Sequence, residues 1–409
     1  MLSDRSAATV RATLPAVGAA IGDIADLFYE KLFAARPELL RDLFNRGNQA
    51  SGDQRRALAG SIAAFATALV EQPGTRPDVM LDRIAHKHAS LGVTPESYEV
   101  VHTHLFAAIA DVLGDAVTPE VAAAWDEVYW LMAGSLIAVE ERLYAQQGVL
   151  AGDVWHAWEV AARVEETEDV ATFLLRPAED TPAPDFRPGQ YVSVQVELPD
   201  GARQIRQYSL SCAPGSRLRS ITVKRVRGEG APDGEVSGHL HEHTRAGDLL
   251  RLSVPYGDLV LDHLDAPLLL ASAGIGCTPM LSMLEHLVQE GHQGPVTVVH
   301  GDRSPADHAL RTDHVRLTEK LPDAEAHFWY ETPDAEAHFW YETPDAGQPA
   351  NRTGLVDLDG ITVRPGTHAY LCGPLPFMRA VRAQLLDAGV RPADVHYEVF
   401  GPDLWLASS

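Results

Sequence analysis

Two histidines flank a lysine in the segment His86-Lys87-His88, and histidine is the commonest protein ligand for metals. On a helix each residue advances about 100° around the axis, so the two imidazoles point to nearly opposite faces. Leu81 and Ile84 mark the apolar stripe of such a helix, and His88 joins that stripe while His86 lies among charged residues. His88 is therefore the candidate metal ligand, although a buried histidine that is merely hydrogen-bonded has the same pattern.

Two further segments carry residue types suited to nucleotide chemistry. In "RQYSLS", Arg206 could bind a phosphate, Tyr208 could pack on a flat ring and Ser209 offers a hydroxyl, but an ordinary amphipathic strand fits equally well. In "SAGIGCTPM", residues 272–280, the glycines let backbone N–H groups approach a diphosphate at a helix N-terminus. The third glycine of the usual dinucleotide fingerprint is missing, so a tight structural turn remains an alternative.

The elements that must position these residues change character twice along the chain. Residues 1–148 are dominated by helical periodicity, with Thr94-Pro95 and Thr118-Pro119 as helix starts. Residues 153–262 alternate between polar and apolar positions in short strands, which is typical of an antiparallel β-barrel. Residues 263–409 alternate buried strands with helices, which indicates an α/β domain with a parallel sheet. We therefore predict a multidomain protein with one all-α, one β-barrel and one α/β domain.

The composition excludes several classes of partner. The 409 residues carry a formal net charge of −24, which argues against nucleic acid and anionic membranes as partners. No apolar stretch approaches the roughly 20 residues that a membrane span needs. Three widely separated cysteines fit a reducing compartment better than a disulfide framework. We expect a cytoplasmic protein without a membrane span, acting as a monomer on small molecules.

The C-terminal two thirds resemble the ferredoxin-reductase-type flavoproteins. The match rests on "RPGQY" (187–191), "RQYS" (206–209), "GIGCTP" (274–279), "YLCGP" (370–374) and "YEVFGP" (397–402). The resemblance implies an FAD site, a nicotinamide site bound through its diphosphate, Cys372 near the nicotinamide and Phe400 over the flavin. The implied cofactor-binding residues are Tyr191, Arg206, Gln207, Tyr208, Ser209, Gly274, Ile275, Gly276, Cys277, Thr278, Pro279, Val399, Phe400, Gly401 and Pro402.

The sequence leaves the choice between NADH and NADPH open. After the second strand of the α/β domain, Asp302 could bond a ribose 2′-hydroxyl, whereas the adjacent Arg303 could accept a 2′-phosphate.

The whole chain resembles the flavohaemoglobins, whose globin domain carries haem b. "LFYEKLF" (27–33), "PELLRDLFN" (37–45), "NQASGDQRRAL" (48–58), "IAHKHASLGVTPESY" (84–98) and "GSLIAVEERLY" (134–144) carry this match. The resemblance makes His88 the proximal iron ligand, with Tyr98 and Glu140 hydrogen-bonded behind it, and it also matches Lys87.

On the distal side, the resemblance implies Tyr29 and Gln54 as donors to bound O₂. Gln54 has a competing interpretation, because Ser51 and Gln54 also fit a capping box at a helix start.

The resemblance implies a nitric oxide dioxygenase, in which electrons pass from NAD(P)H to FAD to haem and haem-bound O₂ reacts with nitric oxide to give nitrate. Two alternatives remain: an O₂ sensor or store, and a general NAD(P)H-dependent reductase of quinones, ferric complexes or peroxides. Tyr98 and Glu140 argue against the first alternative, because electron donation through the proximal ligand favours activating O₂ over carrying it.

The segment "PDAEAHFWYET" occurs twice in succession, at 322–332 and 333–343. The α/β domain offers one sheet position here, so we expect one copy to form a strand and the other to lie at the surface as an insertion. The alternatives are a lid over the nicotinamide and a duplication introduced during sequencing or assembly.

Overall fold

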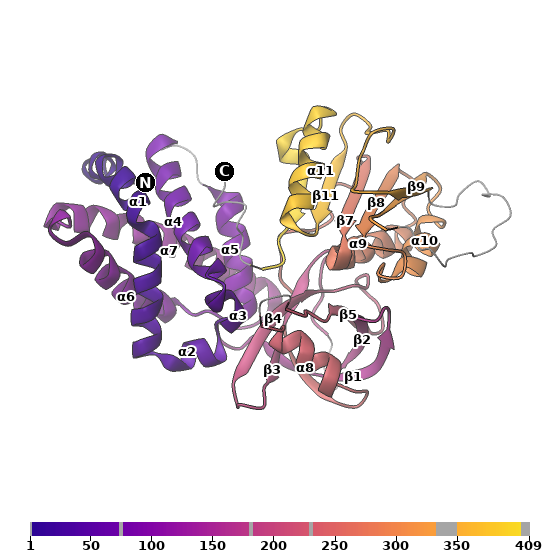
Figure 1. Ribbon diagram of the computed structural model, residues 1–409, viewed down its shortest axis with the longest axis horizontal. Helices are drawn as coiled ribbons and strands as arrows, with labels where there is room; N and C mark the ends of the chain where they lie inside the picture. The colour runs from indigo at the N-terminus through magenta and orange to yellow at the C-terminus, as the bar shows by residue number, and fades with distance from the viewer. Residues whose placement is uncertain (1, 73–76, 180–182, 229–231, 333–349, 402–409) are drawn as a thin grey trace. The chain divides into compact units, whose positions relative to one another are not determined.

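The computed structural model describes the chain except for residues 1, 73–76, 180–182, 229–231, 333–349 and 402–409 (Figure 1). The described chain forms two compact parts. One contains residues 1–155, 195–206 and 401–409, and the other contains residues 156–194 and 207–400.

The N-terminal region is built from helices whose starts follow the sequence signals. Pro95 and Pro119 each occupy the first turn of a helix after a threonine N-cap residue, and the Thr118 hydroxyl accepts a hydrogen bond from the Val121 backbone. Gly92 and Gly148 end two of the helices in the left-handed conformation that glycine tolerates best. The helices are α1 (Asp4–Ala35), α2 (Pro37–Asp42), α3 (Arg46–Ala50), α4 (Asp53–Glu71), α5 (Asp78–Leu91), α6 (Pro95–Leu113) and α7 (Pro119–Gln147).

The first sheet follows α7 and has the strand order β4-β3-β6-β1-β2-β5. Strands β1 and β2, and β2 and β5, pair antiparallel. A bridge between Leu210 and Ile221 brings the chain after β4 against β5, which closes the sheet into the predicted barrel. Its elements are β1 (Trp155–Glu165), β2 (Val170–Pro177), β3 (Tyr191–Glu197), β4 (Arg203–Ser209), β5 (Arg219–Lys224), α8 (Glu235–His243) and β6 (Leu249–Ser253).

The second sheet has the order β10-β9-β8-β7-β11-β12, and its strands are parallel, as predicted. Helices α9 and α10 share one buried core with the sheet, and α11 lies on the opposite face (Figure 1). The elements are β7 (Leu268–Ala273), α9 (Cys277–Gln289), β8 (Val296–Asp302), α10 (Arg311–Thr318), β9 (Ala324–Tyr330), β10 (Ala350–Thr353), β11 (His368–Cys372), α11 (Leu375–Asp387) and β12 (Val395–Glu398).

The first copy of the duplicated segment supplies a strand of this sheet. Strand β9 lies between β8 and β10 and buries Phe328, Trp329 and Tyr330. The second copy, residues 333–343, lies outside the described residues, so its predicted surface position remains a prediction.

None of the helices in the described part of the chain combines the length and apolar character that crossing a membrane requires.

Candidate functional site

The structure brings His88, Tyr98 and Glu140 together from three helices. The Nδ1 atom of His88 on α5 lies 2.9 Å from Oε1 of Glu140 on α7 and 3.0 Å from the hydroxyl of Tyr98 on α6. Tyr98 donates to the same Glu140 oxygen over 2.5 Å. Burial raises the pKa of Tyr98, and the neighbouring Glu140 carboxylate raises it further, so the phenol keeps its proton and remains a donor.

This arrangement selects one ring nitrogen of His88 for a metal. Because Nδ1 donates to a buried carboxylate, Nε2 is left as the ligand atom, which is how metal-binding histidines are commonly oriented. The Nε2 atom of His88, with Glu140 hydrogen-bonded behind the ring, therefore fits haem iron as a ligand.

The helical pattern predicts that His86 is exposed and His88 is buried, but their exposure does not differ in this way. Both residues are half-buried. What distinguishes His88 is its partner Glu140, which lies 52 positions away in the sequence. The pattern on one helix therefore does not distinguish the two histidines by burial, and the contact that distinguishes them is tertiary.

The distal residues also meet. Tyr29 on α1 is 4% exposed, and its ring lies among those of Phe28, Phe33 and Phe44. Burial raises the pKa of Tyr29, and a side-chain hydrogen bond from Gln54 is among the contacts that oppose this rise. A donor to the Tyr29 oxygen leaves the hydroxyl hydrogen free for a ligand.

The capping-box alternative for Gln54 does not describe this helix start. The N-cap residue of α4 is Gly52, one residue later than a box from Ser51 to Gln54 requires. The Ser51 hydroxyl instead bonds the Asp53 carboxylate over 2.7 Å. The Gln54 side chain is thus available to Tyr29.

Sequence reasoning missed a third polar residue, Gln49 on the five-residue helix α3. Its side chain is 6% exposed and is close enough to Tyr29 to lower the pKa of the phenol. Yet neither its amide nitrogen nor its amide oxygen has a partner in good hydrogen-bonding geometry among the described residues. A buried amide without such partners is costly, which fits a site completed by a bound polar ligand.

Strand β4 and the start of β3 carry the predicted flavin residues. Ser209 is buried, and its hydroxyl has no hydrogen-bond partner among the described residues, which fits a site completed by a bound molecule. Arg206 and Tyr208 are half-buried at alternate positions of β4, and Tyr191 is buried at the start of β3. Gln207 points to the face of β4 opposite Arg206 and Tyr208, and its amide donates to Ser193 over 3.0 Å.

The turn after β7 approaches the end of β11 very closely. Gly274 has φ +52°, and a Cβ added to Gly276 would lie 2.3 Å from the Cys372 carbonyl oxygen. Only glycine fits such an approach. Cys277, Thr278 and Pro279 begin α9 and are buried, and Ile275 is half-buried in the turn. The predicted diphosphate segment and Cys372 therefore meet at the carboxyl ends of the parallel strands, where such folds bind ligands.

Burial determines the protonation state of Cys277 and Cys372. Burial raises the pKa of Cys277 and of Cys372, so both are thiols at neutral pH. All three cysteines of the chain are free.

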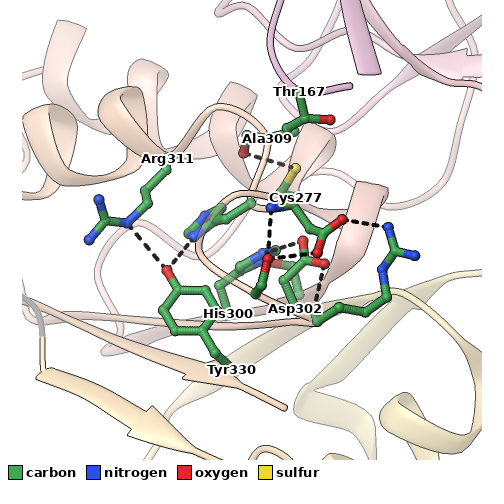
Figure 2. Close-up of polar contacts among 12 residues, drawn as sticks. Thr167, Cys277, His300, Asp302, Ala309, Arg311 and Tyr330 are labelled. Carbon is green, nitrogen blue, oxygen red and sulfur yellow. Dashed lines mark hydrogen bonds and ion pairs between the residues drawn. The ribbon is translucent and has the colours of Figure 1, made fainter. Parts of the chain in front are cut away.

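Figure 2 shows the polar network beside this turn. The imidazole of His300 bonds Ser272 through Nδ1 over 2.9 Å and lies 3.4 Å from the Asp302 carboxylate through Nε2. The Asp302 side chain is only 4% exposed, and it also accepts a hydrogen bond from the Arg303 backbone. Asp302 is therefore occupied inside the protein and is poorly placed to reach a ribose.

Arg303 is exposed but surrounded by carboxylates. Its guanidinium lies 2.5 Å from an oxygen of Asp307 and 3.7 Å from one of Asp169. Such acidic neighbours disfavour a 2′-phosphate at this position, and the ion pairs occupy the guanidinium that would bind it.

The remaining predicted residues lie at the C-terminal end of the described chain. Val399 is half-buried directly after β12. Phe400 is 47% exposed, so its phenyl ring does not belong to the hydrophobic core. The Lys87 ammonium donates to the Gly401 carbonyl over 2.9 Å. Pro402 lies outside the described residues.

Three family models match successive regions of the chain. These are Globin at residues 26–136, Oxidoreductase FAD-binding domain at residues 157–261 and Oxidoreductase NAD-binding domain at residues 270–383. A flavohemoprotein of Rhizobium meliloti is 40% identical, covering 99% of this chain and 100% of its own length. A flavohemoprotein of Bacillus subtilis is 36% identical over the full length of both chains.

The chain belongs to the flavohemoprotein family.

Solved structures of the flavohemoprotein family agree with the fold described above. A flavohemoglobin from Malassezia yamatoensis, solved with bound FAD and heme, is 36% identical and superposes with a TM-score of 0.87, covering 98% of this chain and 100% of the other. The FAD/NAD-binding domain of a nitric oxide dioxygenase from Vibrio cholerae is 33% identical with a TM-score of 0.53, covering 60% of this chain and 99% of that domain. Like its relatives, this flavohemoprotein is an oxidoreductase with a globin domain ahead of FAD- and NAD-binding domains.

Proposed function

We propose that this flavohemoprotein is a nitric oxide dioxygenase that holds haem b, FAD and a nicotinamide coenzyme. The observation that carries the proposal is the buried Glu140 carboxylate behind His88. Family membership supports it, and one structural neighbour is itself named a nitric oxide dioxygenase. When bound, the cofactors supply the redox chemistry: hydride transfer to the flavin, single-electron transfer to iron and oxidation of nitric oxide by O₂ at the iron.

On the proximal side, His88 is the proposed ligand through Nε2. Glu140 accepts the Nδ1 hydrogen and gives the imidazole partial imidazolate character, so the ring donates more charge to iron. Tyr98 donates to the same carboxylate oxygen and fixes its position. A protein that only stores O₂ has no need for this extra donation, so the network favours oxidation over storage.

On the distal side, Tyr29 and Gln54 are the proposed donors to the oxygen ligand, with Gln49 as a second amide beside the Tyr29 phenol. Formation of nitrate from one nitric oxide and one O₂ consumes one electron and develops negative charge on oxygen. Donors already oriented by burial stabilise such charge without reorganising.

In the reductase portion, Arg206, Tyr208 and Ser209 are proposed to hold FAD together with Tyr191. The backbone of Gly274–Pro279 is proposed to hold the coenzyme diphosphate, beside Cys372. Val399, Phe400 and Gly401 are proposed to complete the flavin site. Three free cysteines fit a cytoplasmic location.

One experiment separates the proposal from its alternatives. The reduced holoprotein is saturated with O₂ and then mixed with a single equivalent of nitric oxide in a stopped-flow instrument. Stoichiometric nitrate, formed within milliseconds, is the expected result. Slow or absent nitrate formation with stable bound O₂ would instead indicate storage or sensing. Fast NAD(P)H oxidation with quinones or ferric complexes, without nitrate, would indicate a general reductase.

A further inference from the structure

Three histidines lie close together at the amino ends of strands β11 and β12, whereas the proposed coenzyme site is at the carboxyl ends of the sheet. His368 is the first residue of β11, and His396 is the second residue of β12. Tyr370 pairs with His396 in these parallel strands, so His368, two residues before Tyr370, lies on the same face of the sheet. His263 comes from the segment between β6 and β7, which leads from the barrel into this sheet.

The three imidazoles are close enough to share one ion. Their ring centroids lie 3.7 Å apart for His263 and His368 and 5.5 Å apart for His368 and His396. One nitrogen from each ring lies within 4.8 Å of the nitrogens of the other two. The Nδ1 atom of His368 and the Nε2 atom of His396 are 3.2 Å apart.

The distance between His368 and His396 is slightly shorter than the one a tetrahedral ion requires. With Zn–N bonds of about 2.0–2.1 Å, two nitrogens on a tetrahedral zinc lie about 3.3–3.4 Å apart. The nitrogens of His368 and His396 therefore already have almost the required spacing. The ring of His263 is more exposed and stacks on that of His368 at 3.7 Å, so it must rotate to direct a nitrogen at the shared position.

The surroundings resemble those of metal-binding histidines. With Nδ1 of His368 directed at the shared position, its Nε2 faces the carboxylate of Asp394 at 3.9 Å. Asp394 is itself held by Arg391 through two contacts of 2.6 and 2.8 Å. A carboxylate that accepts a hydrogen bond from a ligating imidazole orients the ring and strengthens it as a donor. Asp394 is at ion-pair distance from His368 and can take this role after a small shift of the ring.

The segment that carries His263 is also anchored. The Tyr370 hydroxyl accepts a hydrogen bond from the Asp262 backbone over 3.4 Å, and the Tyr370 ring stacks on that of His396 at 4.9 Å. The same tyrosine therefore contacts both sides of the cluster. This restraint limits the conformational entropy that ion binding would remove.

We propose that His263, His368 and His396 bind a divalent transition-metal ion with zinc-like preferences. Imidazole nitrogens suit zinc, copper and nickel rather than magnesium or calcium, and three protein ligands leave a fourth position for water. The ion connects the segment after the barrel to strands β11 and β12 and stabilises the reductase portion. It takes no part in hydride or electron transfer, since it binds at the edge away from Gly274–Pro279.

The test uses the full-length protein loaded with haem and FAD and stripped of other metals with a chelator. Zinc(II) affinity is measured by competition with a chromophoric chelator, in the native protein and in the His396→Ala and His263→Ala variants. We expect one tight site in the native protein and at least about 100-fold weaker binding in each variant, since even losing a residue that merely supports a ligand costs 10–100-fold.

The chain offers a matched control. His239 and His243 on α8 are four residues apart with ring centroids 5.1 Å apart, so they form an ordinary helical histidine pair. The His243→Ala variant should keep the native affinity. Zinc should also raise the unfolding temperature of the native protein and of this control, but not of His396→Ala.

Two results would overturn the proposal. Unchanged affinity in His396→Ala and His263→Ala would place any bound zinc elsewhere. Absence of a tight site in the native protein would mean that the cluster is a hydrogen-bonded stack of neutral imidazoles. Reduction of ferricyanide by NADH should be equal in all variants and serves to show that each one is folded.

Discussion

Replacing Glu140 by glutamine tests the proximal network most directly. Glutamine keeps the size of the side chain and one acceptor oxygen but removes the negative charge. Glu140 is 2% exposed and accepts from both Tyr98 and His88, so the change acts inside the protein, where screening is weak.

The expected magnitude follows from the two hydrogen bonds. A hydrogen bond to a charged group contributes about 1.5–3 kcal/mol, whereas a neutral one contributes about 0.5–1.5 kcal/mol. Removing the charge from an acceptor shared by Tyr98 and His88 therefore weakens the network by roughly 2–3 kcal/mol in total. Part of this loss reaches the reaction, and we expect nitric oxide turnover to fall about 10- to 100-fold, as is usual for residues that support a metal ligand.

Two measurements check this prediction. Nitrate formation is followed under steady-state conditions with saturating coenzyme, and resonance Raman spectroscopy of the ferrous protein reports the iron–histidine stretching frequency. The frequency should fall in Glu140→Gln, because a less anionic imidazole binds iron more weakly.

The neighbouring Glu141 provides the control. It is exposed on the same helix, so Glu141→Gln removes the same charge without touching His88, and both measurements should stay at native values. If Glu140→Gln also retains native turnover and the native iron–histidine frequency, the carboxylate is only a structural partner and the reasoning fails.

Three further changes test other parts of the chain. His88→Ala should abolish haem incorporation while FAD stays bound, whereas His86→Ala should keep a full Soret absorbance; a full Soret band in the first variant would exclude His88 as the ligand. NADH should be preferred over NADPH, and Asp307→Asn should raise kcat/KM for NADPH about three- to fivefold by freeing Arg303 from an exposed ion pair, with NADH unaffected; an unchanged ratio would show that the 2′-phosphate binds elsewhere. Deleting 333–343 should leave NAD(P)H oxidation and flavin-to-haem transfer within a factor of about three, as expected for a change distant from the chemistry. After this deletion eight residues remain between β9 and β10, and they can span about 27 Å. The distance from the end of β9 to the start of β10 is only roughly 10 Å in the parallel register. Loss of folding or of hydride transfer would make the second copy an integral part of the domain.

The features that could be predicted from the sequence are those encoded locally. The helix starts at Thr94-Pro95 and Thr118-Pro119 depend on neighbouring residues alone, and both appear in the structure. The change from alternating to continuous apolar strands likewise predicts which sheet is antiparallel and which is parallel. One copy of the duplicated segment forms a strand, as expected from the single place available in the sheet.

The features that could not be predicted depend on contacts between distant segments. Asp302 ends β8, where a ribose ligand is expected, but its carboxylate lies 3.4 Å from Nε2 of His300, and the His300 ring is held through Nδ1 by Ser272 on the neighbouring strand β7. No pattern within a few residues of Asp302 distinguishes these two outcomes.

The position at which α4 begins determines which contact the Gln54 side chain can make. Had α4 begun one residue earlier, Gln54 would have occupied the third helical position and could have bonded the Ser51 backbone as a cap. Gly52, with φ +75°, delays the start and leaves the Gln54 amide for Tyr29. The same short connection includes α3, which carries Gln49 into the interior beside the same phenol. The glycine and the short helix before it therefore determine how many amides surround Tyr29, and Gly52→Ala should disturb the pocket through the backbone, because alanine disfavours a positive φ.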